Sequence, residues 1–234
     1  MLDKKLETNK DTRTKVLIGE DNFARLKNAT VAVVGVGGVG GITAEMLLRA
    51  GVGNLILIDF DTFDITNLNR QIGSLKSKVG EKKVNVFKER FADIDEGANV
   101  AALNEKLTAE NIAELLKGAT YIVDACDDID AKAAIIKYAV DNKIKFISAM
   151  GAGNRIDISH LKIAKLSKTS YCPLAKKVRQ ALPKKYHDKT KVAFYESEIT
   201  KPAIKTNFVG TISYSPNFMG IRITSEVILD IIGG

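Results

Sequence analysis

A glycine-rich turn carries the most specific chemical signal in this sequence. Gly35, Gly37 and Gly40 follow the spacing G-x-G-x-x-G, between an apolar run at 30–34 and an amphipathic stretch at 40–50. In a strand–turn–helix unit, the first glycine permits a tight turn, and the second lets backbone N–H groups approach a phosphate. The third lets the helix pack closely on the strand, with its positive end towards the anion. We therefore predict a nucleotide-binding loop.

Polar side chains that follow other predicted strands extend this site. Asp59 is placed to hydrogen-bond a ribose hydroxyl. Arg70 and Lys83 offer two cations for phosphates, and Asp127 offers a carboxylate suited to Mg²⁺. Hydride transfer needs neither a magnesium site nor two phosphate-directed cations, so this set favours ATP over NAD. Asn67 and Gln71 are two further polar residues, close to Arg70 in the sequence, and they belong to the same predicted cluster.

Alternating strands and helices must bring these residues together. The fold class predicted from this alternation is α/β, a doubly wound and mostly parallel Rossmann-like sheet with an antiparallel C-terminal extension. We expect a short basic helix at 173–182 and a mobile basic loop at 182–191 in the extension. Predicted strands are 30–34, 54–58, 100–103, 121–123, 145–149, 160–166 and 192–195, and the other predicted helices are 40–50, 80–94, 108–117, 131–142 and 218–232.

Length and composition fit one domain over residues 1–234. We divide it into a helical lead-in at 1–29, a nucleotide-binding core at 30–151, and a sheet extension with a basic loop and a terminal helix at 152–234. The apolar positions of the lead-in are Val16, Leu17, Ile18, Phe23 and Leu26.

The N-terminus, the apolar runs and the cysteines indicate the cellular compartment in which the protein is expected. The polar N-terminus lacks the apolar core of a signal peptide, and no apolar run is long enough for a membrane span. Two cysteines, Cys126 and Cys172, cannot form a disulfide framework, so we expect a cytoplasmic protein. Cys126 directly precedes Asp127 and is interpreted as a small strand-end core residue.

Basic residues cluster late in the chain. Residues 162–191 contain ten Lys or Arg and one acidic residue, Asp188, although the net charge of the whole chain is only +7. A basic block beside a nucleotide site suggests a nucleic-acid partner, and a solvated surface loop is the alternative interpretation. The residues predicted to contact RNA are Lys176, Lys177, Arg179, Lys184 and Lys185.

The ordered motifs GVGGVGG, DFD, TNLNRQ, VGEKK and DACDD resemble those of the ubiquitin-activating-like adenylyltransferases, from Arg13 to about Gly151. The resemblance implies attack of a carboxylate on the α-phosphate of ATP, giving an acyl-adenylate and pyrophosphate. It also implies that Asp127 holds Mg²⁺ and that Arg13 reaches the site of a second subunit, so that the enzyme is a homodimer. The catalytic residues would be Arg13, Arg70, Lys83 and Asp127, and the ATP-binding residues Gly35, Gly37, Gly38, Gly40, Asp59, Asp61, Asn67, Arg70, Gln71, Lys83 and Asp127.

A narrower branch of this family, the tRNA threonylcarbamoyladenosine dehydratases, is similar over nearly the whole chain. The similarity includes PLAKKVR at 173–179 and the C-terminal segment from GTISYSPNFMG onwards. It implies ATP-dependent cyclisation of threonylcarbamoyladenosine beside the anticodon of certain tRNAs, and a sulfur-relay protein is a candidate partner. Because the substrate supplies its own nucleophile, no enzyme cysteine is needed. The C-x-x-C zinc pairs common in sulfur-carrier activators are absent from the sequence, as is any cysteine after Cys172.

The sequence is also compatible with three alternatives. An adenylyltransferase for the C-terminal glycine of a sulfur-carrier or ubiquitin-like protein would need a carrier rather than RNA. An NAD-dependent oxidoreductase would tolerate loss of Arg70 or Lys83. A catalytically silent RNA-binding module would bind tRNA without consuming ATP.

Overall fold

Seven strands form a single sheet in the order β3-β2-β1-β4-β5-β7-β6, in a computed structural model that describes residues 8–233. All neighbouring strands are parallel except β6, which pairs antiparallel with β7. The predicted doubly wound, mostly parallel sheet with an antiparallel extension is therefore confirmed. The strands are β1 (Thr30–Val34), β2 (Asn54–Ile58), β3 (Asn99–Leu103), β4 (Tyr121–Asp124), β5 (Lys145–Ala149), β6 (Leu161–Lys165) and β7 (Lys191–Tyr195).

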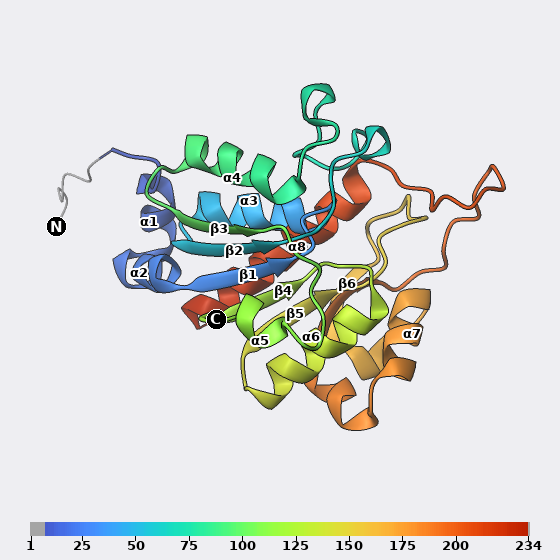
Figure 1. Cartoon of the computed structure of the whole chain (residues 1–234). Helices are drawn as coiled ribbons and strands as arrows, with labels where there is room; N and C mark the ends of the chain where they lie inside the picture. Colours follow the sequence, from blue (N-terminus) through green and yellow to red (C-terminus); the bar gives the residue numbers. More distant parts are fainter. Residues whose placement is uncertain (1–7, 234) are drawn as a thin grey trace.

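Helices cover both faces of this sheet (Figure 1). One face carries α3 (Gly40–Ala50), α4 (Lys83–Ile94) and α8 (Tyr214–Ile232). The other carries α5 (Ile112–Leu115), α6 (Ile129–Asp141) and α7 (Pro173–Ala181). This arrangement explains the continuous apolar run of β1. Val31 and Val33 lie in the first core, whereas Ala32 and Val34 lie in the second, so both faces of the strand are buried.

The lead-in contains two helices, α1 (Thr12–Ile18) and α2 (Glu20–Asn28). Phe23 and Leu26 of α2 are buried. The side chains of Val16 and Leu17 of α1, by contrast, are 67% and 83% exposed when a single copy of the chain is considered by itself. The first seven residues of the predicted lead-in, including much of the polar N-terminus, lie outside the described residues. Within the described part, no helix combines the length and apolar character of a membrane span.

Several predicted elements have different limits in the structure, and the helix expected at 80–94 is α4, which starts at Lys83. The helix expected at 108–117 is only α5, because the Oδ1 atom of Asn111 accepts the Thr108 N–H at 2.8 Å and closes a turn there. The last helix starts at Tyr214, four residues earlier than expected. The mobile basic loop expected at 182–191 is wrong, since a 3-10 helix spans Lys184–Lys189. Its buried Tyr186 donates a hydrogen bond to Asp141 at 3.0 Å.

Candidate functional site

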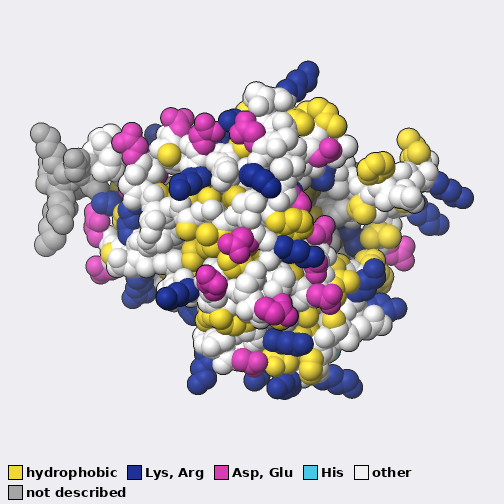
Figure 2. Space-filling model, viewed as in Figure 1, with side chains coloured by type: hydrophobic (Ala, Val, Ile, Leu, Met, Phe, Trp, Pro, Cys, Tyr) yellow, Lys and Arg dark blue, Asp and Glu magenta, His cyan; other side chains and the backbone are white. Residues whose placement is uncertain are grey.

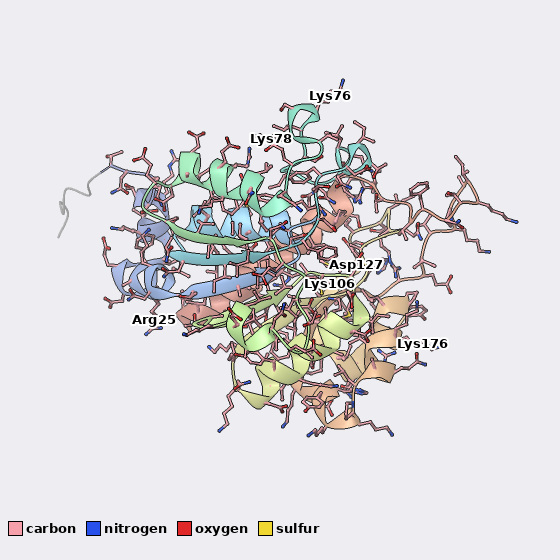
Figure 3. The ribbon with its side chains drawn as sticks, viewed as in Figure 1. Arg25, Lys76, Lys78, Lys106, Asp127 and Lys176 are labelled. Carbon is pink, nitrogen blue, oxygen red and sulfur yellow. The ribbon has the colours of Figure 1, made fainter. Side chains whose placement is uncertain are left out.

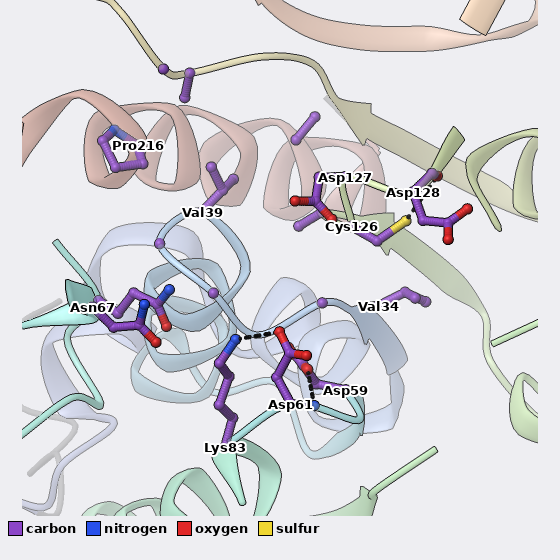
Figure 4. Close-up of a pocket in the computed structure, with 18 of the residues that line it drawn as sticks. Val34, Val39, Asp59, Asp61, Asn67, Lys83, Cys126, Asp127, Asp128 and Pro216 are labelled. Carbon is purple, nitrogen blue, oxygen red and sulfur yellow. Dashed lines mark hydrogen bonds and ion pairs between the residues drawn. The ribbon is translucent and has the colours of Figure 1, made fainter. Parts of the chain in front are cut away.

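A cavity of about 830 Å³ opens at the carboxyl edge of the sheet (Figure 4). It lies between the ends of β1 and β4, where the strand order reverses direction and open α/β sheets bind their ligands. Four separate segments supply the predicted ATP-binding residues that line it. These residues are Gly35, Gly37, Gly38, Asp59, Asp61, Asn67, Arg70, Gln71, Lys83 and Asp127.

The glycine loop after β1 is held by backbone contacts that exclude side chains. Gly35 adopts a φ of +84°, and a Cβ there would lie 2.8 Å from the carbonyl oxygen of Ala125. A Cβ at Gly40 would lie only 1.8 Å from the carbonyl oxygen of Gly35. Gly40 is therefore a packing residue beneath the loop and does not line the cavity. These contacts fit the predicted tight turn and close helix–strand approach.

Asp59 fastens the glycine loop to the turn after β2. Its Oδ2 accepts the Val36 N–H at 2.8 Å, and its Oδ1 accepts the Asp61 N–H at 2.9 Å. Burial raises the pKa of this carboxyl above its ordinary value, although Lys83 and the two N–H donors oppose the shift. Each oxygen keeps a second lone pair, so the carboxylate can still accept a ribose hydroxyl from the cavity.

A buried lysine supplies positive charge at the cavity wall. Lys83 is the first residue of α4 and is 6% exposed, and its Nζ lies 2.8 Å from Oδ2 of Asp61 (Figure 4). Asn67 is also buried, and it forms a capping box with Asp64, whose N–H it accepts at 3.1 Å. The capping box fixes the short 3-10 helix Ile65–Asn67 and thereby the position of Asn67 on the cavity wall.

Arg70 and Gln71 complete this wall. Nη1 of Arg70 donates to the carbonyl oxygen of Thr66 and to Oδ1 of Asn69, both at 2.9 Å. The Oε1 atom of Gln71 is buried and has no hydrogen-bond partner within residues 8–233. A buried unpaired acceptor is costly, so a donor group from a bound molecule or water is expected there. Asn217 of α8 donates to the Arg70 carbonyl at 2.8 Å and holds the segment in place.

Asp127 extends into the cavity from the loop after β4 (Figure 4). Its carboxylate is exposed and, among the described residues, has no hydrogen-bond or ion-pair partner. Asp128 instead caps α6, accepting the N–H groups of Asp130 and Ala131 at 2.9 and 3.0 Å. Residues 8–233 contain no group of three or more metal-ligating side chains. One free carboxylate beside a phosphate site nevertheless fits Mg²⁺, which is commonly bound by one or two carboxylates plus substrate phosphates.

Cys126 lies beside Asp127 but has the properties of an inert thiol. Burial, and next the nearby Asp124 carboxylate, raise its pKa well above the ordinary value. Its Sγ lies 3.1 Å from Oδ1 of Asp124 as a hydrogen-bond donor. The interpretation of Cys126 as a strand-end core residue is consistent with this environment, since the thiolate is the nucleophilic form.

Arg13 is not brought to the cavity of its own chain. It is an exposed residue of α1, which lies at the far end of the molecule from the cavity (Figure 1). A contribution from Arg13 would therefore have to come from a second copy of the chain, as the family resemblance implies.

Four of the five predicted RNA-contacting residues are exposed. Independently of these positions, Figure 2 shows Lys and Arg side chains gathered along the lower edge of the molecule. Lys176 points outward from α7 (Figure 3), and Lys177 is exposed beside it. Arg179 is different, because its Nη1 donates to the carbonyl oxygens of Leu166 and Thr169 at 3.3 and 3.1 Å. The guanidinium of Arg179 is therefore less available to RNA than the two exposed lysines, and its predicted RNA contact stays a prediction. Lys184 and Lys185, on the 3-10 helix after α7, are also exposed.

Several cavity residues escaped the sequence analysis. Lys106, from the irregular segment after β3, pairs with Asp128 at 3.3 Å and lies 5.8 Å above the Phe60 ring. Pro216 packs on the glycine loop, where a Cβ at Gly38 would lie 3.2 Å from its own Cβ. A proline in the first turn is a recognised start signal for a helix and could have revealed the true beginning of α8. The remaining missed residues include Phe208 and Val209.

The chain matches the model of the ThiF family over residues 11–229 and belongs to that family. It is similar to a tRNA threonylcarbamoyladenosine dehydratase of Bacillus subtilis, with 44% identity over 174 residues, which are 74% of this chain and 68% of that protein. It thus spans about two thirds of that relative's length. A sulfur carrier protein ThiS adenylyltransferase of the same organism is 34% identical over 139 residues, 58% of this chain and 41% of that protein.

A solved structure resembles the whole fold. The crystal structure of the Escherichia coli tRNA N6-threonylcarbamoyladenosine dehydratase in complex with ATP matches with a TM-score of 0.90 and 31% identity. The match covers 96% of this chain and 94% of that one. The resemblance to the ubiquitin-activating-like adenylyltransferases is confirmed at the level of the family.

Proposed function

We propose that this chain is an ATP-dependent tRNA threonylcarbamoyladenosine dehydratase. The observation that carries the proposal is the fold match over nearly all of both chains to a dehydratase solved with ATP. The 44% identity to a second dehydratase points the same way. The cavity between β1 and β4, with its glycine loop and its cations, has the composition that ATP requires.

Two chemical steps would follow from this assignment. A carboxylate oxygen of the threonylcarbamoyl group attacks the α-phosphorus of ATP, the bond between the α-phosphorus and the bridging oxygen breaks, and pyrophosphate leaves. A nucleophile of the same side chain then attacks the activated carbonyl carbon, the carbon–oxygen bond to AMP breaks, and the ring closes. The nucleoside loses one water, and ATP becomes AMP and pyrophosphate. No enzyme thiol takes part.

The residues of the cavity divide this work between them. Asp59 accepts a ribose hydroxyl while its bond to the Val36 N–H keeps the glycine loop in place. Lys83 and Arg70 offset the charge that develops on the phosphates, and burial of Lys83 strengthens its field. Asp127 would hold Mg²⁺, which would supply positive charge to offset that of the phosphates and of the leaving pyrophosphate. Asp61 keeps Lys83 directed into the cavity through their 2.8 Å ion pair.

The proposal includes an RNA surface that contains the exposed lysines of α7. Lys176 and Lys177 would contact phosphates of the tRNA. Replacing both lysines by alanine should weaken tRNA binding and reduce the slope of log affinity against log salt by about two, one for each lost phosphate contact. Lys88→Ala is the matched control, since Lys88 is an exposed lysine of α4 on the other face of the sheet. Equal salt slopes for both variants would remove α7 from the RNA surface.

A homodimer completes the proposed active site. Arg13 would enter the cavity of the partner copy, and the exposed Val16 and Leu17 of the same helix supply apolar surface for the contact. A sulfur-relay protein remains a candidate partner. The reaction would take place in the cytoplasm, where tRNA is available and the free thiols of Cys126 and Cys172 would stay reduced.

The decisive experiment is incubation of the purified protein with ATP, Mg²⁺ and tRNA that carries open threonylcarbamoyladenosine. Gentle digestion and mass spectrometry should show an ATP-dependent loss of one water from that nucleoside. Pyrophosphate exchange that appears only with an added carrier protein would instead assign the adenylyltransferase alternative. RNA binding without ATP consumption would assign a silent binding module.

A further inference from the structure

An irregular segment between β7 and α8 contributes part of the cavity wall. We call residues 199–213 the strap; it is the loop that projects on the right in Figure 1. Its apolar side chains are unusually open to solvent, with Ile204 and Phe208 each 76% exposed. Phe208 and Val209 nevertheless line the cavity, whereas Ile204 does not. The strap therefore presents an uncovered aromatic ring at the rim of the ATP site.

Backbone contacts hold the base of the strap at that rim. Asn154, in the segment after β5, accepts the Thr200 N–H at 2.9 Å and donates its own N–H to the Gly210 carbonyl at 2.7 Å. These two bonds close residues 200–210 into a loop. Thr211 is fastened in turn, because Asn69 Nδ2 donates to its carbonyl at 3.2 Å. The position of Phe208 is thus set by contacts on both sides of the cavity.

The charge of the strap itself suits a polyanion. The strap carries Lys201 and Lys205, and no acidic residue occurs between Glu198 and Glu226. An exposed aromatic ring flanked by lysines is the combination that binds unpaired nucleotides: the ring stacks on a base, and the ammonium groups neutralise the backbone. A protein partner with an apolar surface could bind the aromatic ring but would not need the lysines. The two lysines therefore favour RNA as the partner of the strap.

We propose that Phe208 stacks on a base of the single-stranded loop of the substrate RNA, at or next to the modified nucleoside, while Lys201 and Lys205 contact the adjoining phosphates. This inference rests on the proposed function, since it takes the substrate to be a tRNA modified beside its anticodon. Stacking at the rim would orient the nucleoside so that its carboxylate enters the cavity towards the α-phosphate.

The absence of tryptophan from the chain allows a direct optical test. Phe208→Trp places a single indole at the proposed stacking position, and Ile204→Trp places one on the same strap at a position with equal exposure. Titration with an anticodon stem–loop RNA should quench the fluorescence of the first variant far more than that of the second. Annealing the RNA to its full complement should abolish the quenching. Equal quenching in both variants would overturn the proposal.

Alanine variants measure the energetic part of the inference. Phe208→Ala should weaken RNA binding roughly 5- to 150-fold, the range expected for loss of one base–aromatic stack. Ile204→Ala should change it less than about twofold, and Phe208→Trp should bind nearly as wild type. Affinity for ATP should stay unchanged in Ile204→Ala, because Ile204 does not line the cavity. Equal losses for Phe208→Ala and Ile204→Ala, or a loss confined to binding of a carrier protein, would overturn the stacking contact.

The dehydration assay separates this inference from the proposed function. If the wild-type protein dehydrates the nucleoside but Phe208→Ala binds and reacts normally, the stacking contact is wrong and the proposed function stands. If the Phe208 variants show the predicted RNA effects but the wild-type protein never dehydrates the nucleoside, the base contact stands and the proposed function fails.

Discussion

A buried ion pair ties together three elements behind the cavity, and its removal has a calculable cost. Lys132 of α6 and Asp124 at the end of β4 are both 0% exposed, and Nζ lies 3.0 Å from each carboxylate oxygen. Nζ also donates to the carbonyl of Ala149 at 2.7 Å, at the end of β5. Ser148 donates to the same carboxylate at 2.5 Å. The pair therefore fixes the two strand ends from which Asp127 and the segment after β5 extend.

Lys132→Met keeps the length of the side chain and removes its charge, leaving Asp124 buried without its cation. Removal of one member of a buried pair costs about 3–5 kcal/mol. We expect the lower value, about 3 kcal/mol, because Ser148 and the thiol of Cys126 still donate to the carboxylate. With a urea dependence of about 2–3 kcal/mol per molar, the unfolding midpoint should fall by about 1–1.5 M.

Urea unfolding followed by far-ultraviolet circular dichroism measures this change. Lys137→Met, an exposed position on the same helix, is the matched control and should stay within about 0.5 kcal/mol of wild type. Adding Asp124→Asn to Lys132→Met should restore part of the lost stability, since the uncompensated charge is then removed. A midpoint for Lys132→Met that equals that of Lys137→Met would refute the reasoning.

Two further predictions concern the site and the C-terminal helix. Asp127→Ala should reduce AMP formation by about 10²- to 10³-fold. It should not lower the melting temperature, because this exposed carboxylate has no partner in the described part of the chain. Adenylation at the normal rate would remove Asp127 from the mechanism. Asp230 is partly buried, which opposes ionisation, but hydrogen bonds from Lys191 and Tyr121 still hold its pKa below the ordinary value of 3.8. Its ionised form therefore stabilises the fold above about pH 4, and this contribution is lost as the pH falls further. Asp230→Asn should cost about 1 kcal/mol at pH 7 and progressively less below pH 4 in urea titrations, and a pH-independent difference would contradict this assignment.

The sequence predicts those parts of the molecule whose signals are local. The limits of β1, α3 and β2 agree with the expected ranges, because the glycine turn and the apolar periodicity specify each boundary within a few residues. The lining residues from the glycine loop to Asp127 could also be predicted, since the carboxyl ends of parallel strands meet at one edge of the sheet.

Contacts between distant segments explain what the sequence could not predict. A helical wheel places Arg179 with Lys176 and Lys177, but the carbonyl groups of Leu166 and Thr169 draw its guanidinium away from solvent. Phe208 lies in an irregular segment without periodicity. Its place at the cavity depends on the backbone bonds to Asn154, about fifty residues earlier in the chain, and on the bond from Asn69 to the Thr211 carbonyl.

The state of the two cysteines bears on the chemistry of the second step. An adenylate that passes its acyl group to an enzyme requires a thiolate near the cavity. Cys126 is close enough, but burial and Asp124 raise its pKa, so that the nucleophilic form is scarce at neutral pH. Cys172 is only 5% exposed, at the start of α7. With no other cysteine in the chain, the acyl group is best accepted by a nucleophile on the substrate itself, which is what a cyclisation provides.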